Sequence, residues 1–270
     1  MMGSPHYRDS AVSKRGDHHT HAIAIAIHGD GIPTIARGQS WAKSFEVYSW
    51  CSMLGEGETT TLCNFYIWMI CKSAEVKAAV GNTRAVWHRV LCWSLECLWT
   101  GRWPTHDHNG ARYRGGAEEA LGGSLLAGGY YAVVWALKGD LEYHQNSLGL
   151  KNCFCCKANR TTMPWTDMTP KAAWLESNHT EASWRLANPS PNPLLCVSGV
   201  CGAHAPCPDL MHCKHLGTDQ YFQGSVITLL LSDILPGSKA ENLTQFNGEL
   251  KLYWDAHLAD SGNMYGRKRK

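Results

Sequence analysis

Two aspartates follow apolar stretches of the sequence and could hold a divalent cation. Asp30 follows the alternating residues 22–27, and Asp140 follows the apolar residues 130–137. Ligands bind at the carboxyl ends of neighbouring strands in an α/β sheet, and two carboxylates brought close together there usually share a cation. Such oxygen ligands suit Mg²⁺ or Mn²⁺ in two-metal phosphoryl transfer. The alternative is that both are turn residues, because Asp-Gly and Gly-Asp pairs are common at strand ends.

A second candidate site is a short cysteine cluster. Cys153 and Cys156 have the C-x-x-C spacing that lets two thiolates bind one tetrahedral Zn²⁺. Further ligands for such a site are available later in the chain: Cys196, Cys201, His204, Cys207, His212, Cys213 and His215. The alternative is that these are reduced cysteines of a cysteine-rich chain.

A third candidate is the polar pair Asp209 and His212. Two residues three positions apart at the start of a helix lie on one face, where they could point into a cleft or toward the zinc ligands. Asp209 is equally suited to cap the helix, which would leave His212 exposed or in the core. Residues 266–270 (GRKRK) form a basic cluster that could contact phosphates or act as a nuclear import signal, or be a solvated tail.

The elements that would position these residues follow from the hydrophobic pattern. Strands are expected at residues 21–33, 44–54, 60–71 and 130–140, and helices within 73–99, 211–235 and 242–258. The first and last of these strands are apolar on both faces, which is typical of central strands. The order strand, meander, helix, strand predicts an α/β protein with a ribonuclease-H-like mixed sheet flanked by helices.

Five regions are expected along the chain. They are a disordered leader (1–20), the ribonuclease-H-like core (21–150), a Cys/Pro-rich irregular insertion (151–208), a helical segment (209–260) and a basic tail (261–270). Residues 101–129 hold eight glycines and are expected to be a loop with at most a short helix.

Composition limits the class of protein. The 270 residues are 44% hydrophobic and 18% charged, which excludes a wholly disordered chain. The net charge of +2 gives no global sign of a nucleic-acid binder. No apolar run approaches the length of a membrane span, and no signal peptide is expected. The twelve cysteines are therefore interpreted as those of an intracellular protein, nuclear or cytoplasmic, that keeps them reduced or binds metal.

Taken in order, the segments resemble the catalytic core of CACTA-type (En/Spm-like) DNA transposases. The matching segments are residues 27–33, 47–70, 133–150, 153–160 and 209–227, so that the resemblance covers about residues 22–235. The order of the segments and the D-x-M-H block are its more specific parts. Part of the last segment also looks like repetitive-element proteins of protists.

The resemblance implies a DNA strand-transferase core of the DDE/D type that acts on transposon ends. Asp30 would match its first metal-binding acid and Asp140 its second, with Mg²⁺ or Mn²⁺ as cofactor. Cys153 and Cys156 would match the zinc knuckle of the family. Asp209 and His212 would match the D-x-x-H block, and both are therefore expected at the catalytic site.

The chain departs from the family in two respects. The third acid of the family lies well beyond the Met-His helix, and here Glu241 and Glu249 stand in no recognisable motif. The DNA-binding region that precedes the core in a full transposase has no counterpart. The chain is therefore expected to be a truncated copy of the transposase core, and both an active and an inactive copy are considered. The alternatives are a zinc-stabilised module that binds DNA or protein without chemistry, or a translated fragment without function. A homo-oligomer or a missing partner chain could complete the site.

Overall fold

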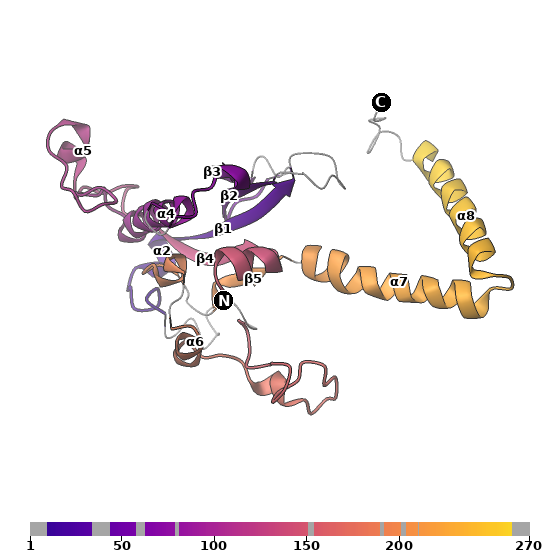
Figure 1. Cartoon of the computed structure of the whole chain (residues 1–270). Coiled ribbons are helices and arrows are strands. Elements are labelled where there is room, and N and C mark those ends of the chain that lie inside the picture. Colours follow the sequence, from indigo (N-terminus) through magenta and orange to yellow (C-terminus); the bar gives the residue numbers. More distant parts are fainter. Residues whose placement is uncertain are drawn as a thin grey trace. The chain divides into compact units, whose positions relative to one another are not determined.

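A computed structural model describes residues 10–33, 44–57, 63–78, 81–150, 154–189, 192–200, 204–209 and 211–260. The chain divides into two compact units, Met1–Asp209 and Leu210–Lys270. The first unit holds the sheet, and the second holds the helices α7 and α8 (Figure 1). Within the described residues, no helix combines the length and the apolar character that crossing a membrane requires.

Five strands in the described residues form one mixed sheet with the order β3-β2-β1-β4-β5 (Figure 1). They are β1 (Ala22–Pro33), β2 (Ser44–Ser52), β3 (Phe65–Cys71), β4 (Tyr131–Gly139) and β5 (Pro206–Pro208). The first three strands form an antiparallel meander, β4 lies parallel to β1, and β5 lies parallel to β4. The chain is therefore an α/β protein, as the sequence predicts.

β1 and β4 are central strands and lie side by side. Ile25 and Ile27 of β1 and Leu137 of β4 are almost fully buried, because a sheet covered on both faces needs apolar side chains on both. The apolar pattern on both faces predicts that the strands of Asp30 and Asp140 are adjacent and parallel, and the pairing of β1 with β4 confirms this.

Helix α4 (Thr83–Thr100) makes the crossover that a parallel pair of strands requires. The side chain of Asn82 accepts a hydrogen bond from a backbone N–H of the first turn and caps the helix. Gly101, which has a left-handed conformation, ends it. Leu91 and Leu95 on its apolar face are buried in the main core, so that the helix covers the sheet and returns the chain to β4.

Shorter elements complete the first unit. They are α2 (His18–His21), α5 (Gly116–Leu121), α6 (Glu181–Ala187), the 3-10 turns Lys72–Ala74, Ala173–Glu176 and Pro193–Cys196, and the π-helical turn Tyr143–Ser147. Residues 10–20 differ from the expected disordered leader, because they form turns and most of α2. Val12 is buried against Tyr131 and Val133 of β4.

The Cys- and Pro-rich segment after β4 packs into the main core. Trp184 of α6, Leu194 and Leu195 are almost fully buried and share one cluster with Leu137 of β4. The end of the segment supplies β5, an edge strand that the sequence analysis did not expect. Three residues with two prolines carry no strand pattern, and proline is tolerated at a sheet edge because no partner needs its N–H.

The described residues of the second unit, 211–260, are mostly helical. A π-helical segment (Met211–Asp219) leads into α7 (Gln220–Leu229), and a further π-helical turn (Leu230–Ile234) precedes α8 (Lys239–Asp260). The side chain of Asn242 is buried and donates a hydrogen bond to the carbonyl oxygen of Leu231 at 2.8 Å. This contact joins α8 to the preceding turn.

Candidate functional site

Tyr143 packs onto the two glycines that precede the predicted aspartates. A Cβ added at Gly29 would lie 2.0 Å from the Tyr143 ring, and one added at Gly139 would lie 2.3 Å from it. Only glycine leaves room for the ring at these positions of β1 and β4. Asp30 and Asp140 directly follow these two glycines, so the packing of Tyr143 sets where both aspartates stand.

Asp30 and Asp140 line one pocket of about 430 Å³ at this edge of the sheet. The other lining residues are mostly polar: Gly31, Glu46, Lys72, Glu75, Lys77, Arg84, Glu142, Tyr143, Asn146 and Ser147. Oδ1 of Asp140 also accepts a hydrogen bond from the backbone N–H of Tyr143 at 2.6 Å. This carboxylate therefore caps the helical turn after β4, a structural role beside the predicted one.

The two aspartates occupy different points of their strands. β1 continues beyond Asp30, which pairs with Val47 of β2, as far as Pro33. β4 ends at Gly139, so Asp140 is the first residue after its strand. Asp140 therefore stands at the end of its strand as expected, whereas Asp30 lies within β1 and pairs with β2.

Asp209 stands at the same edge, because β5 brings it beside the end of β4. Its backbone N–H donates to the carbonyl oxygen of Gly139 at 2.9 Å, and the register pairs Gly139 with Pro208. Three neighbouring parallel strands thus lead to Asp30, Asp140 and Asp209. The side chain of Asp209 is half-buried but does not line the pocket of the other two.

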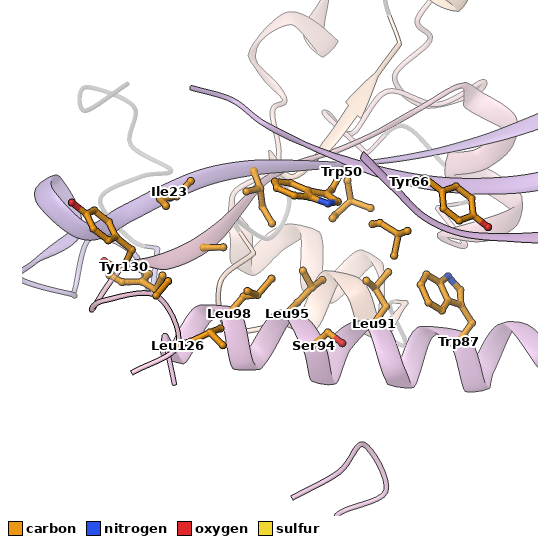
Figure 2. A pocket seen from close by; sticks show the side chains of 16 residues that line it. Ile23, Trp50, Tyr66, Trp87, Leu91, Ser94, Leu95, Leu98, Leu126 and Tyr130 are labelled. Carbon is orange, nitrogen blue, oxygen red and sulfur yellow. The ribbon is translucent and has the colours of Figure 1, made fainter. Parts of the chain in front are cut away.

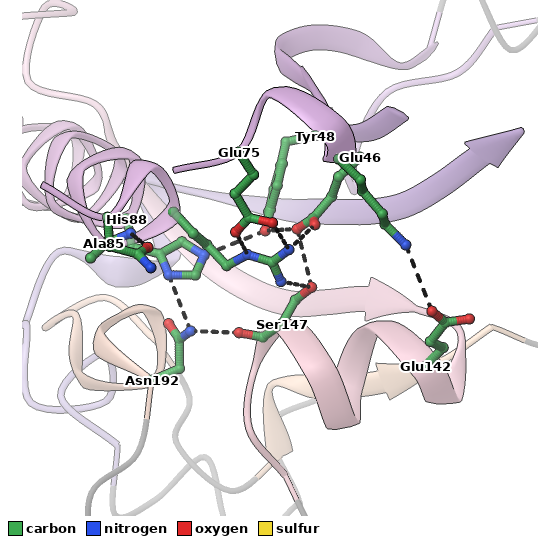
Figure 3. Close-up of polar contacts among 11 residues, drawn as sticks. Glu46, Tyr48, Glu75, Ala85, His88, Glu142, Ser147 and Asn192 are labelled. Atoms are coloured by element: carbon green, nitrogen blue, oxygen red, sulfur yellow. Dashed lines mark hydrogen bonds and ion pairs between the residues drawn. The ribbon is translucent and has the colours of Figure 1, made fainter. Parts of the chain in front are cut away.

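A buried group of charges forms one wall of the pocket (Figure 3). The guanidinium of Arg84 in α4 lies 2.6 Å from Oε2 of Glu46 in β2 and 3.1 Å from Oε1 of Glu75, and these three residues are named the Arg84 cluster. The side chains of Glu46 and Glu75 are only 5% and 9% exposed, so both depend on Arg84 for compensation. Burial lowers the pKa of Arg84, but the carboxylates of Glu46 and Glu75 more than reverse this and raise it above its ordinary value.

A chain of hydrogen bonds beside the Arg84 cluster fixes a neutral histidine. The amide of Asn192 donates to Nδ1 of His88 at 3.2 Å, and Nε2 of His88 lies 3.4 Å from the Tyr48 hydroxyl (Figure 3). That hydroxyl donates to Glu46 at 2.7 Å, so its oxygen accepts from the Nε2–H group. Burial, and then the charge of Arg84, lower the pKa of His88 to about 4.

The end of the sheet that carries Asp30, Asp140 and Asp209 is named the acidic edge. Its ligands are of the kind that binds a divalent cation, but too few of them come together in the described residues. The carboxylate oxygens of Asp30 and Asp140 are hard ligands of the kind that Mg²⁺ prefers. Within the ranges that the structure describes, no three or more His, Cys, Asp or Glu side chains form a group that could hold a metal ion. The two-metal site that the resemblance implies is therefore incomplete in these residues.

The predicted zinc ligands are only partly described. Cys153 and the side chain of His212 lie outside the described residues, as do residues 261–270 with their basic cluster. Cys156 is buried and lines a further pocket with Lys157 and His179. Burial, and then the charge of Lys157, lower the pKa of His179, which keeps its ring in the neutral form that binds metals. Zinc binding at Cys156 stays a prediction.

A separate cavity of about 520 Å³ lies between α4 and the sheet (Figure 2). Figure 2 shows Leu91, Leu95 and Leu98 of α4 pointing from the helix toward Trp50 and the strands. None of its described lining residues is acidic, basic or a thiol. Its hydroxyl groups are those of Ser94 and three tyrosines, with no acid or base among the described lining residues to activate them, so the pocket of Asp30 and Asp140 is the stronger candidate site.

No family model, no curated protein and no solved structure matches the chain. The resemblance to CACTA-type transposases therefore rests on the motifs of the sequence alone. Any function of the acidic edge therefore depends on the chemistry of the residues that line it.

Sequence reasoning missed the Arg84 cluster, although one signal of it was present. Glu46 and Tyr48 occupy the same face of β2, and a charged residue on the inward face of a strand indicates a buried partner. The partner itself could not be named, because Arg84 stands 38 residues further along the chain in another element. His179 was missed because nothing in its local sequence points to Cys156.

Proposed function

We propose that the chain is a ribonuclease-H-like domain derived from a CACTA-type DNA transposase. Its acidic edge would be the site of metal-dependent cleavage or strand transfer at DNA phosphodiesters. The observation that carries this proposal is that Asp30 and Asp140 come from adjacent parallel strands and line one pocket. The sheet order, with a meander, a crossover helix and then a parallel strand beside the first, agrees with the layout of that fold.

The residues of the edge would have distinct roles. Asp30 and Asp140 would hold Mg²⁺ or Mn²⁺, which supplies activation of water or of a DNA 3′-hydroxyl and stabilises the leaving oxygen. Asp209, at the end of β5, is the predicted site residue that can add a carboxylate at this edge. Glu241 is less suited, because its carboxylate accepts hydrogen bonds from the backbone and hydroxyl of Ser238 at the start of α8. Transposon-end DNA would be the partner, in the nucleus or the cytoplasm.

A binding module without catalysis is the second candidate function. It is favoured by the finding that, where the structure describes the chain, fewer than three potential metal ligands come together. A two-metal centre that lacks one of its acids loses the anchor of its second ion. The same edge would then bind DNA without cleaving it.

The first test is a nicking and strand-transfer assay on plasmid DNA with Mg²⁺ or Mn²⁺. It compares the wild type with the double variant Asp30→Asn/Asp140→Asn. Asparagine keeps the size of both side chains, and at position 140 it keeps an oxygen that can accept the N–H of Tyr143. We expect the double variant to lose activity by about 100-fold or more, the scale on which loss of a catalytic group is felt.

The control is Asp233→Asn, which removes an exposed carboxylate from the second unit. We expect it to nick DNA as the wild type does, and thermal unfolding verifies that all three proteins are folded. Equal activity in the wild type and the double variant would contradict the proposed site. A folded wild type that binds DNA but does not cleave it with either cation would establish the binding module instead.

A further inference from the structure

The pocket of the proposed function contains two lysines to which that function assigns no role. Lys72, in the 3-10 turn after β3, and Lys77, in the segment before α4, both line it. We propose that these lysines form the phosphate-binding side of the pocket and hold the backbone of a nucleic-acid strand beside Asp30 and Asp140. The inference rests on the proposed function and deepens it, because it names the contacts of the substrate.

The charges of the pocket separate into the buried Arg84 cluster and a set outside it. The guanidinium of Arg84 is not available to a ligand, because it is shared between two buried carboxylates and also donates to Ser147 Oγ at 2.9 Å. The remaining charged side chains that line the pocket are Asp30, Asp140, Glu142, Lys72 and Lys77. The two lysines are therefore the cations that this pocket can offer to a ligand.

The ammonium group of Lys72 lies against β1 at the residue that follows Asp30. A Cβ added at Gly31 would be 3.6 Å from Nζ of Lys72. The same Nζ is 3.7 Å from Oε1 of Glu142 (Figure 3), and these side chains are 40% and 66% exposed. An exposed ion pair contributes little to stability, so a phosphate can replace Glu142 as the partner of this ammonium group.

Lys77 complements Lys72 from the next segment of the chain. Its side chain is exposed, and no described residue forms an ion pair with it. Lysine binds phosphate as a compact point charge without demanding a fixed orientation. Carboxylates alone would repel a DNA strand, and the two ammonium groups beside them offset this repulsion where they contact its phosphates, without a bound cation.

The test measures DNA binding in EDTA, so that neither cleavage nor a divalent cation takes part. Fluorescence anisotropy of a labelled DNA duplex and of a labelled single strand is followed between about 50 and 200 mM KCl. The double variant Lys72→Gln/Lys77→Gln is expected to bind about tenfold more weakly at the low-salt end. The slope of log K against log salt is expected to become shallower by about one for each lysine.

The matched control is Lys14→Gln/Lys171→Gln, which removes the same charge from two exposed lysines of the first unit that do not line the pocket. It is expected to keep the affinity and the slope of the wild type. Equal losses in the two double variants, an unchanged Lys72/Lys77 variant, or a wild type that does not bind DNA would each overturn the inference. Equal unfolding midpoints verify that all three proteins are folded.

The result of this DNA-binding test can be distinguished from the result of the cleavage assay that tests the proposed function. A wild type that binds through the two lysines but cleaves no DNA supports the inference and contradicts the proposed cleavage. A wild type that cleaves DNA, with binding unaffected by the lysine changes, contradicts the inference alone. In EDTA, the Asp30→Asn/Asp140→Asn variant is expected to bind at least as tightly as the wild type, because two negative charges are gone.

Discussion

Gly139 is one of two glycines of the sheet, with Gly29, at which an added side chain would collide with Tyr143. A Cβ at Gly139 would lie 2.3 Å from the ring of Tyr143 and 2.9 Å from the carbonyl oxygen of Gly29. Tyr143 is buried and Gly29 belongs to a central strand, so neither can move without disturbing the sheet. We expect Gly139→Ala to lower the free energy of unfolding by about 3 kcal/mol, as measured by urea denaturation.

Gly31→Ala is the matched control for this prediction. The atom nearest to its added Cβ is Nζ of Lys72 at 3.6 Å, the end of a flexible side chain. We expect this variant to change the stability by less than about 1 kcal/mol. If both variants unfolded at the same urea concentration, the proposed packing of Tyr143 on Gly139 would be wrong.

His88 makes the stability of the first unit depend on pH. Its pKa is about 4 in the folded protein, against an ordinary value of 6.5, because burial and Arg84 disfavour the charged ring. Between these values the unfolded chain binds a proton that the folded chain does not. Stability is therefore complete above about pH 6.5 and falls as the pH decreases toward 4. Between about pH 7 and 5 the loss is on the order of 2 kcal/mol.

The measurement compares urea unfolding of the wild type and His88→Gln at these two pH values. We expect the variant to lose less stability on acidification, because glutamine has no proton to gain. Taking the difference between the two proteins cancels the contributions of the other histidines. Equal losses in both proteins would show that His88 is protonated without cost, contrary to its hydrogen bond from Asn192.

Among the elements, the Arg84 cluster ties α4 to β2 and to the turn after β4. Replacing Arg84 by methionine keeps the apolar stem but leaves two almost buried carboxylates without a cation. We expect Arg84→Met to destabilise the first unit by about 3–5 kcal/mol. Adding Glu46→Gln and Glu75→Gln should restore part of this loss, because amides need no counter-charge. A wild-type unfolding midpoint for Arg84→Met would contradict the assignment of a buried ion pair.

The central elements were predictable because their signals are local. β1 carries three alternating isoleucines and β4 an apolar run on both faces, so each strand reveals its buried position within ten residues. Helix α4 shows its apolar spacing and ends at Gly101, a residue suited to terminate a helix. The apolar residues on both faces of β1 and β4 favour central positions for both strands, which agrees with their lying side by side in the sheet.

The rest of the site could not be predicted, because its contacts join distant parts of the sequence. No local pattern distinguishes Gly29 and Gly139 from other glycines, and only the structure shows that Tyr143 lies on both. β5 has three residues, too few for a period, although it brings Asp209 to the edge. The pairing of Arg84 with Glu46 spans a meander and a helix, and no local pattern encodes it.

On the scale of the whole molecule, the first unit has one main cluster of buried side chains beside two small ones. Residues 151–208, expected as an irregular insertion, lie within this unit. Trp184, Leu194 and Leu195 of that segment share a cluster with Ile27 and Leu137 of the central strands. A segment that contributes its largest side chain to the common core cannot unfold by itself without exposing the sheet.

Trp184→Ala is therefore expected to destabilise the whole first unit by about 3–5 kcal/mol, because it leaves a cavity under a fully buried side chain. Leu186→Ala, on the same helix but 85% exposed, should change the stability by less than about 0.5 kcal/mol. Hydrogen exchange measures both effects residue by residue. In the Trp184 variant, the amides of β1 and β4 should exchange faster together with those of α6. Faster exchange confined to α6 would mean that the segment is a separate subdomain and that the sheet does not rely on it.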